Sequence, residues 1–345
     1  MPRLFFILSG EHPTLPIAEL KANLEAETIA YKKLQKLPQV LRLTTSIDAV
    51  EALKRRAALT RVCCREIAVC APTHMEIAAA VRSQPIDTLL ESGETFAVRV
   101  RRIGERTNDL TSVDLERKLG KLILESVRNA KVDLKKPRKI FFGTVTGNTF
   151  LFGLKLAEIL PTPFMQRRPR KRPFFHPSAM PPKLARCMVN LAKARLGEVL
   201  LDPFCGTGSF LIEAGLLGCR VVGLDAKRYM VKGCRRNLKL LGVAWEGLGA
   251  ADAMHLPIST ADCIVTDPPY GRSASTMGYT TGRIVEDFLA DSVNVLAKGQ
   301  RVCLAAPRTI GVGGMAEAVG FRHVESHMVY VHRSLTREVA VLERA

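Results

Sequence analysis

From residue 199 onwards, short apolar runs alternate with helical stretches, and this pattern constrains the fold more than any other feature. The segments 210–217 and 229–241, which lie between such runs, have the length and spacing of helices. Short apolar strands separated by helices predict a parallel, doubly wound α/β sheet. The apolar runs are 199–201, 221–224, 263–266 and 302–306, and a terminal antiparallel hairpin is expected from 323–331 and 338–342.

The first 70 residues predict a smaller α/β unit. Their apolar pattern follows the order strand, helix, strand, strand, helix, strand, which is typical of a ferredoxin-like fold. A second small unit follows, in which 96–101 alternates like a half-buried strand, Thr111 caps a helix, and 140–154 forms a hairpin around Gly147. The predicted organisation is a ferredoxin-like domain (1–70), a second α/β domain (71–157), a basic Pro-rich linker (158–175) and the doubly wound domain (176–345).

The charge balance predicts a polyanionic partner. The chain has 51 Lys and Arg residues against 33 Asp and Glu residues, a formal net charge of +18. An excess of this size favours nucleic acid, although a merely basic surface stays open. Within the linker, residues 167–172 contain five cations and no acidic residue, and such a density suits phosphate contacts. The predicted RNA-binding residues are Arg99, Arg101, Arg167, Arg168, Arg170, Lys171 and Arg172.

A D-x-x-x-G-x-G motif, made by Asp202, Gly206 and Gly208, follows the expected strand 199–201 and precedes a helix. Its glycines let the backbone approach a ligand, and the helix N-terminus offers unpaired N–H groups. Leu211 stands where a dinucleotide fingerprint has Gly or Ala, and Asp202 would repel a pyrophosphate. A cationic α-amino group, as in the methionine end of S-adenosylmethionine, suits Asp202 better.

Two further aspartates follow later strands. Asp225 ends the next strand, where a carboxylate can accept both hydroxyls of a ribose. Asp252 follows a third short segment and is placed to receive an adenine amino group. A single Asp is as often a surface or capping residue, but three at successive strand ends are a rarer coincidence. The motif and these aspartates predict a binding site for a methyl donor.

The tetrad Asp267-Pro268-Pro269-Tyr270 follows the apolar run 263–266 and predicts an acceptor site for an aromatic amine. Such an amine is a poor nucleophile because its lone pair is delocalised into the ring. The Asp267 carboxylate and the Pro268 carbonyl can accept its two N–H bonds, which favours a nitrogen whose lone pair points at the methyl group. Tyr270 offers a face for stacking on an extruded base. Asp267, Pro268 and Tyr270 are the predicted catalytic residues.

The tetrad and two other segments resemble a known family. Residues 267–273 look like the acceptor motif of the archaeal and eukaryotic tRNA guanosine-10 N(2)-methyltransferases, and 172–180 resemble the segment that enters that family's catalytic domain. Residues 95–156 resemble the C-terminal part of a THUMP domain, an RNA-binding module of several tRNA-modifying enzymes. Ser209 departs from the pattern, since glycine is expected there in many relatives.

The resemblance implies a Rossmann-like S-adenosylmethionine-dependent methyltransferase domain preceded by a ferredoxin-like and THUMP RNA-binding region. The expected reaction is methyl transfer to the exocyclic amino group of a guanosine in tRNA, with position 10 suggested by the family. Whether one methyl group or two are added stays open. The alternatives are another tRNA guanine, ribosomal RNA, a DNA adenine amine, a non-catalytic RNA-binding protein and a nicotinamide oxidoreductase. The predicted cofactor-binding residues are His176, Asp202, Pro203, Phe204, Gly206, Gly208, Asp225, Asp252 and Ala253.

The remaining composition favours a cytoplasmic enzyme. The nine cysteines contain no C-x-x-C pair, which predicts reduced thiols and a cytosolic setting. The apolar run 4–8 is too short to span a bilayer and lacks a cleavage site, so a first strand is expected and no membrane partner. The histidines between 323 and 332 lack the cysteine or carboxylate set of a zinc site, and no metal is expected. The glycine-rich segment 311–314 lacks the Lys-Ser/Thr ending of a phosphate-binding loop and is expected to be an ordinary loop. The expected partner is tRNA; a small helper protein stays open, and otherwise a monomer is expected.

Overall fold

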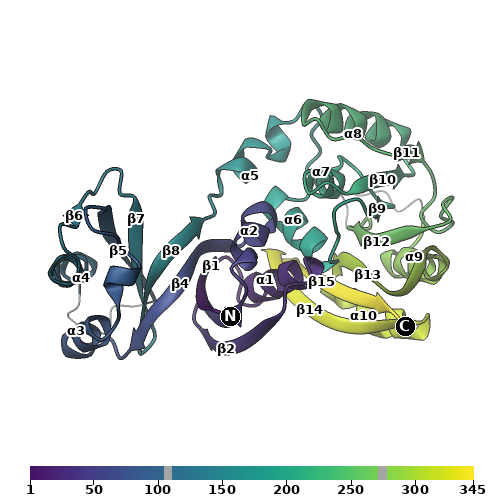
Figure 1. Ribbon diagram of the computed structural model, residues 1–345. Coiled ribbons are helices and arrows are strands. Elements are labelled where there is room, and N and C mark those ends of the chain that lie inside the picture. The colour runs from purple at the N-terminus through teal and green to yellow at the C-terminus, as the bar shows by residue number, and fades with distance from the viewer. Residues whose placement is uncertain (105–110, 271–277) are drawn as a thin grey trace. The chain divides into compact units, whose positions relative to one another are not determined.

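The computed structural model describes residues 1–104, 111–270 and 278–345 and separates into two compact units. The first unit is built on one eight-stranded sheet of order β2-β3-β1-β4-β8-β7-β5-β6 (Figure 1). Its strands are β1 (Arg3–Leu8), β2 (Tyr31–Leu37), β3 (Val40–Thr45), β4 (Thr60–Cys70), β5 (Thr95–Ile103), β6 (Lys131–Val132), β7 (Lys139–Thr146) and β8 (Thr149–Glu158).

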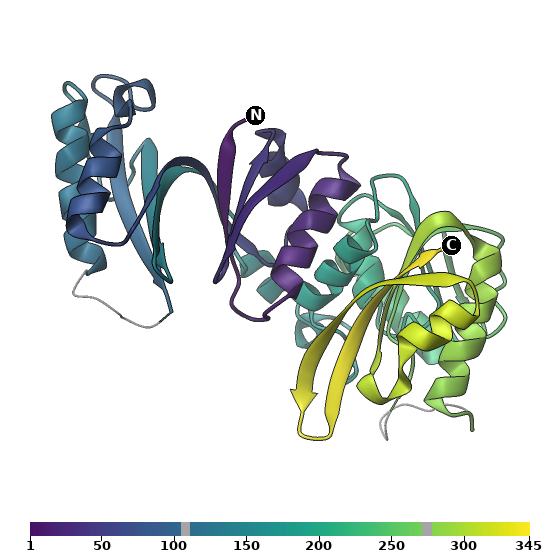
Figure 2. The same ribbon diagram turned by 90° about the horizontal axis from the view of Figure 1, so that it is seen from below.

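The antiparallel half β2-β3-β1-β4 has the strand order of a ferredoxin-like fold, as predicted. Strand β4 also pairs antiparallel with β8, so the sheet continues without a break into the second half. There, helices α3 (His74–Arg82) and α4 (Ser112–Ser126) lie along the sheet (Figure 2). Their apolar faces share a core with phenylalanines of the strands, and Thr111 caps α4 by accepting the Asp114 N–H, as expected.

The second unit contains a seven-stranded sheet of order β11-β10-β9-β12-β13-β15-β14. The pairings among the first five strands of this order are parallel, whereas β15 is antiparallel to both β13 and β14. This is the predicted doubly wound sheet with a terminal hairpin. Its strands are β9 (Val199–Asp202), β10 (Arg220–Asp225), β11 (Gly247–Ala250), β12 (Ala261–Thr266), β13 (Leu296–Pro307), β14 (Phe321–His332) and β15 (Leu335–Arg344).

Alternate residues of these strands enter two different cores, one on each face of the sheet. On β9, Leu200 packs with helices α6, α7 and α8, whereas Leu201 packs with α9 and α10. The sheet is therefore covered on both faces. The helices are α6 (Pro182–Leu191), α7 (Ser209–Gly215), α8 (Arg228–Leu240), α9 (Thr281–Val295) and α10 (Val312–Ala318).

The N-terminal helix α1 (Leu15–Ala26) and residues 55–59 belong to this second unit. Glu19 on α1 is fully buried, and its carboxylate accepts the N–H groups of Ala58 and Leu59 and one N–H of the Asn190 side chain on α6. The units thus divide the chain differently from the predicted boundaries at 70, 157 and 175, which stay a prediction. The remaining helix of the N-terminal region is α2 (Asp48–Arg56).

Two shorter segments complete the description. The Pro-rich segment contains a short helix α5 (Thr162–Gln166) and a turn at Pro169–Lys171, each with proline in its first two positions. The prediction of a loop at residues 311–314 is wrong, because helix α10 begins at Val312. Two of its side chains, Val312 and Ala316, pack in the core. Among the described residues, every helix is too short or too polar to span a bilayer.

Candidate active site

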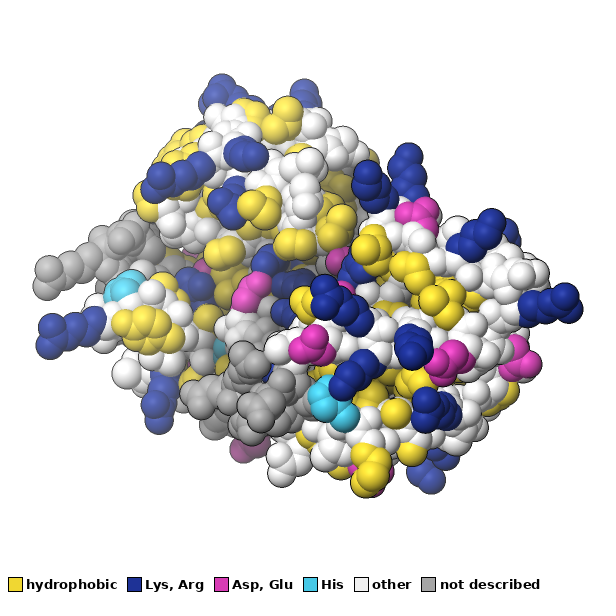
Figure 3. Space-filling model, turned by 90° about the vertical axis from the view of Figure 1, so that its left-hand side faces the viewer, with side chains coloured by type: hydrophobic (Ala, Val, Ile, Leu, Met, Phe, Trp, Pro, Cys, Tyr) yellow, Lys and Arg dark blue, Asp and Glu magenta, His cyan; other side chains and the backbone are white. Residues whose placement is uncertain are grey.

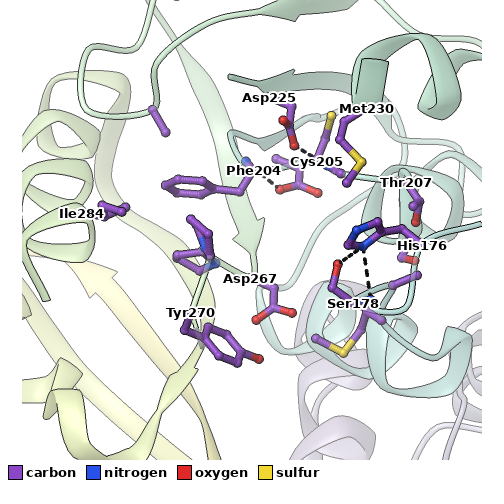
Figure 4. A pocket seen from close by; sticks show the side chains of 18 of the residues that line it. His176, Ser178, Phe204, Cys205, Thr207, Asp225, Met230, Asp267, Tyr270 and Ile284 are labelled. Carbon is purple, nitrogen blue, oxygen red and sulfur yellow. Dashed lines mark hydrogen bonds between the residues drawn. The ribbon is translucent and has the colours of Figure 1, made fainter. Parts of the chain in front are cut away.

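A cavity of about 1140 Å³ lies at the carboxyl ends of the strands of the second sheet. The strand order reverses between β9 and β12, and ligands of open α/β sheets bind at such a point. Four aspartates that line the cavity each lie at or just beyond the end of a strand: Asp202 after β9, Asp225 after β10, Asp252 after β11 and Asp267 after β12. The aspartates predicted for the donor site and the aspartate predicted for the acceptor site therefore line the same cavity (Figure 4).

Asp202 lies at the floor of this cavity and is fully buried. Its Oδ1 accepts the Thr266 hydroxyl at 2.8 Å and the Phe204 N–H at 3.2 Å. Its Oδ2 is buried and has no hydrogen-bond partner among the described residues. Burial raises the pKa of Asp202 to about 8, against the lowering effect of the two hydrogen bonds, and the neighbouring Asp225 and Asp267 add to the rise. The free oxygen is suited to a buried cationic group.

The loop between β9 and α7 is shaped by its glycines and by Asp225. The Gly206 N–H donates to Asp225 Oδ2 at 3.0 Å, and the Lys227 N–H donates to Oδ1 at 2.9 Å. Burial raises the pKa of Asp225. Gly208 has a φ of +83°, and a Cβ there would lie 2.6 Å from the Cys234 sulfur. Gly208 is absent from the cavity lining, so it shapes the loop rather than lining the site.

The other predicted donor-site residues line the same cavity. Pro203 and Phe204 lie in the loop, and Figure 4 shows the Phe204 ring across the cavity from His176. The His176 Nδ1 lies 2.7 Å from the Ser178 hydroxyl and also accepts the Ser178 N–H. Asp252 is exposed and Ala253 is buried.

The acceptor tetrad forms the opposite wall of the cavity. Figure 4 shows the Asp267 carboxylate pointing into the cavity with Tyr270 beside it, and Pro268 and Pro269 also line it. Asp267 Oδ1 is buried without a hydrogen-bond partner among the described residues, as is Asp202 Oδ2. Burial raises the pKa of Asp267 to about 6, while Arg337 and the Tyr270 hydroxyl act to lower it. Residues 271–273, the end of the family-like motif, lie outside the described residues.

Arg337 on β15 is a site residue that the sequence reasoning missed. Its Nη2 lies 3.6 Å from Asp267 Oδ2, its Nε donates to the Tyr270 hydroxyl, and its Nη1 donates to the Met180 sulfur at 3.4 Å. The Arg337 guanidinium also lies 5.6 Å from the centre of the Tyr270 ring. Arg337 stands 67 residues beyond the tetrad on an antiparallel strand, and no local motif marks it. Only the pairing of β13 with β15 brings it to the site.

The structure corrects the RNA-binding prediction for two linker arginines. Arg167 makes two hydrogen bonds to the buried carboxylate of Glu213, at 2.6 and 2.8 Å. Arg172 is 6% exposed, and it donates to the Arg167 carbonyl and to the Ser209 hydroxyl. These groups anchor the linker to α7 and are not available to phosphates. The serine that replaces an expected glycine is thus the hydrogen-bond acceptor for Arg172.

The other predicted RNA-binding cations are more exposed to solvent than Arg172. Arg168, Arg170, Lys171 and Arg101 are exposed, whereas Arg99 is half-buried and donates to the Leu134 carbonyl at 2.8 Å. On the face drawn in Figure 3, Lys and Arg side chains are spread widely and acidic ones are fewer. Within the described residues, no group of three or more His, Cys, Asp or Glu side chains is placed to hold a metal ion.

Two family models match the chain. Residues 169–338 match the family described as RMKL-like, methyltransferase domain, and residues 73–154 match the THUMP domain. The predicted fold class is confirmed by these matches. A crystal structure of TrmN from Thermus thermophilus has a TM-score of 0.56, with 23% identity over 99% of this chain and 100% of that chain, and supports the fold.

Curated relatives match between 64% and 99% of the chain. The tRNA (guanine(10)-N2)-dimethyltransferase of Methanothermobacter thermautotrophicus is 39% identical over 342 residues, which is 99% of each chain. That of Pyrococcus abyssi is 34% identical over 72% of this chain and 74% of its own length. A tRNA (guanine(6)-N2)-methyltransferase of Thermus thermophilus is 33% identical over 64% of each chain. The family suggested by the acceptor motif is confirmed: the chain belongs to the tRNA (guanine(10)-N2)-dimethyltransferase family.

Proposed function

We propose that this protein transfers methyl groups from S-adenosylmethionine to the exocyclic amino group of guanosine 10 in tRNA, giving N(2)-methyl- and then N(2),N(2)-dimethylguanosine. The observation that carries the proposal is the pair of buried, unpartnered carboxylate oxygens, Asp202 Oδ2 and Asp267 Oδ1, in one cavity. An unmade hydrogen bond of a buried polar group is unfavourable, so both oxygens are suited to ligand groups that donate.

The donor half of the cavity fits S-adenosylmethionine by the chemistry of its groups. Asp202 Oδ2 would accept the cationic α-amino group, and Asp225 would accept the ribose hydroxyls, since each of its oxygens keeps a lone pair. Asp252 and Ala253 would lie at the adenine. When bound, the donor supplies an electrophilic methyl group on a sulfonium. His176, Pro203, Phe204 and Gly206 would complete the walls, with Gly208 setting the turn.

The acceptor half would activate the amine. Asp267 Oδ1 and the Pro268 carbonyl would accept the two N–H bonds and stabilise the positive charge that develops on the nitrogen. Tyr270 would stack on the base, because Arg337 holds its hydroxyl and fixes the ring. Orientation then supplies much of the remaining rate. For the second transfer only one N–H remains, so one acceptor suffices.

The RNA would be held outside the cavity. The THUMP domain and the exposed cations Arg101, Arg168, Arg170 and Lys171 are suited to contacts with phosphates. We place the reaction in the cytoplasm, consistent with nine free cysteines.

The direct test is methylation of a tRNA transcript with labelled donor, followed by mass spectrometry of its nucleosides. Wild type is expected to give N(2)-methylated guanosine at position 10. Asp267→Asn should lower kcat by about 10²–10³-fold with tRNA binding retained, because the amide cannot stabilise the charge as a carboxylate does. Asp287→Asn, at an exposed ion pair on α9, is the matched control and should keep full activity. Full turnover by Asp267→Asn, or modification at guanosine 6 instead, would refute the proposal.

A further inference from the structure

Helix α8 of the second unit carries an unusual charge. Its 13 residues, Arg228–Leu240, contain five cations and no acidic residue. All five are exposed, and none of them forms an ion pair with another described residue. These cations are Arg228, Lys232, Arg235, Arg236 and Lys239.

The cations share one face of the helix. Arg228, Lys232, Arg235 and Lys239 follow one another at spacings of four, three and four residues, which places them on a single stripe about 16 Å long. The opposite face is buried in the core of the unit through Met230, Val231, Cys234 and Leu238. We call the exposed stripe, with Arg236 beside it, the α8 basic face.

Stability of the helix does not explain this arrangement. Like charges three or four residues apart repel one another, and the α8 basic face contains several such pairs. Arg228 also stands in the first turn, where the helix dipole disfavours a cation. A set of exposed charges that opposes its own helix is better explained by an anionic partner.

The linker segment that carries further exposed cations is hydrogen-bonded to α8. The Asn237 side chain of α8 accepts the Phe174 N–H at 3.0 Å and donates to the Phe174 carbonyl at 2.9 Å. The Phe174 ring packs edge-on against Tyr229, with centroids 6.5 Å apart. Just before Phe174, Arg168, Arg170 and Lys171 are exposed. Tyr229 is 52% exposed, so an aromatic ring stands among the cations.

The face also begins at the active-site cavity. Lys227, the residue before α8, and Met230 in its first turn both line the cavity. A polyanion on the α8 basic face would therefore lie beside the cavity that the acceptor base must enter, on the side of Asp225.

We propose that the α8 basic face, together with Arg168, Arg170 and Lys171, binds the RNA phosphate backbone beside the cavity that receives the nucleotide being methylated. The identity of the RNA as tRNA rests on the proposed function. Cations with an exposed aromatic ring suit RNA, in which phosphates and unstacked bases occur together. An anionic membrane is disfavoured, because an interfacial helix inserts its apolar face and that of α8 is buried in the core.

The test compares a variant of α8 that loses three positive charges with a variant that keeps all of them. Arg235→Gln/Arg236→Gln/Lys239→Gln removes three cations far from the cavity, whereas Arg235→Lys/Arg236→Lys keeps every charge. Binding of unmodified tRNA is measured from 50 to 300 mM salt. The slope of log K against log salt is negative, and each lost phosphate contact should reduce its magnitude by about 0.7–0.9. The triple Gln variant is thus expected to lose about 2–3 from the slope and about tenfold or more in affinity at low salt.

The Lys variant should keep the wild-type slope, and both variants should bind S-adenosylmethionine normally, which shows that they are folded. A wild-type slope for the triple Gln variant would overturn the proposal. So would unchanged tRNA binding together with lost binding to vesicles of anionic lipid. If wild type binds tRNA without methylating it, the proposed function fails, but the comparison of slopes still decides the role of the α8 basic face.

Discussion

Asp202 Oδ2 and Asp267 Oδ1 stand out at the scale of single residues, because both are buried acceptors without a partner among the described residues. Leaving a buried polar group unpaired costs about 1–3 kcal/mol. The cost is consistent with a site that is completed by its ligands. Both carboxyl groups also have raised pKa values, about 8 for Asp202 and about 6 for Asp267, because burial disfavours the charged form.

Donor binding should release a proton from Asp202. With a pKa of about 8, this carboxyl is largely protonated at pH 6–7 in the free protein. A cationic α-amino group favours the ionised form, so the affinity for S-adenosylmethionine should rise with pH up to about 8. Calorimetry at pH 6.5 in two buffers of different ionisation enthalpy measures the released proton. Asp202→Asn should show no release, and equal enthalpies for wild type in both buffers would contradict the assignment.

Arg337→Gln should shift the acid limb of the pH–activity profile to higher pH. Asp267 must be ionised to accept an N–H, so kcat/KM for tRNA is expected to fall as the pH drops through about 6. The Arg337 cation lowers this pKa, and its removal raises it, so the fall should begin at higher pH. The other ionisable groups lining the cavity are His176, Asp202, Cys205, Asp225, Lys227, Asp252, Tyr270, Tyr279 and His332.

The matched control is Arg322→Gln, an exposed arginine of the same hairpin that pairs with Glu343. It should leave the profile unchanged. The same midpoint for Arg337→Gln and wild type would show that Arg337 does not act on Asp267.

Local sequence was enough to find the aspartates but not Arg337. Each aspartate immediately follows an apolar strand or a short segment, so its position at the sheet edge follows from the strand pattern. The cavity residues of the hairpin, His332, Ser334 and Arg337 among them, reach the site only through pairing of distant strands. For the linker arginines, the local sequence predicted a function that the structure does not support. Charge density predicted that Arg167 and Arg172 bind RNA, but they bind Glu213 and Ser209, which lie on α7 and are distant in sequence.

At the scale of elements, the donor loop depends on close contact between its second glycine and α8. Gly208→Ala should destabilise the second unit by about 1–3 kcal/mol, since a Cβ would be strained at φ +83° and would meet the Cys234 sulfur at 2.6 Å. Gly197→Ala is the control, because Gly197 has φ +80° and nothing within 4 Å of its Cβ. The difference between the two variants isolates the clash.

Adding Cys234→Ala to Gly208→Ala should recover part of the loss, because the clashing sulfur is then absent. Urea midpoints of the unfolding transition of the second unit provide the measurement. Equal midpoints for Gly208→Ala and Gly197→Ala would mean that α8 does not restrict the loop.

Helices and strands were predicted correctly where the apolar periodicity was clear. The prediction failed where glycines suggested a loop. The glycines at 311, 313 and 314 suggested a loop, yet α10 starts there because Val312 and Ala316 pack into the core beside α9. Tertiary packing outweighed the low helix propensity of glycine.

At the scale of the whole molecule, the chain order of elements was predictable, but their grouping was not. Helix α1 is in the right place along the chain for a ferredoxin-like unit, yet the buried Glu19 links it with residues 58 and 59 and with Asn190 of α6. A carboxylate that reaches across 171 residues leaves no local pattern. The predicted combination of a THUMP domain and a methyltransferase domain is confirmed by the family matches.

The central claim is that Asp267 and Pro268 activate an exocyclic amine of the base. Its most direct test is methyl transfer to a tRNA in which guanosine 10 is replaced by inosine, which lacks only the 2-amino group. Wild-type protein should bind this tRNA as it binds the guanosine form and transfer no methyl group to it. Methyl incorporation at the inosine would contradict the account.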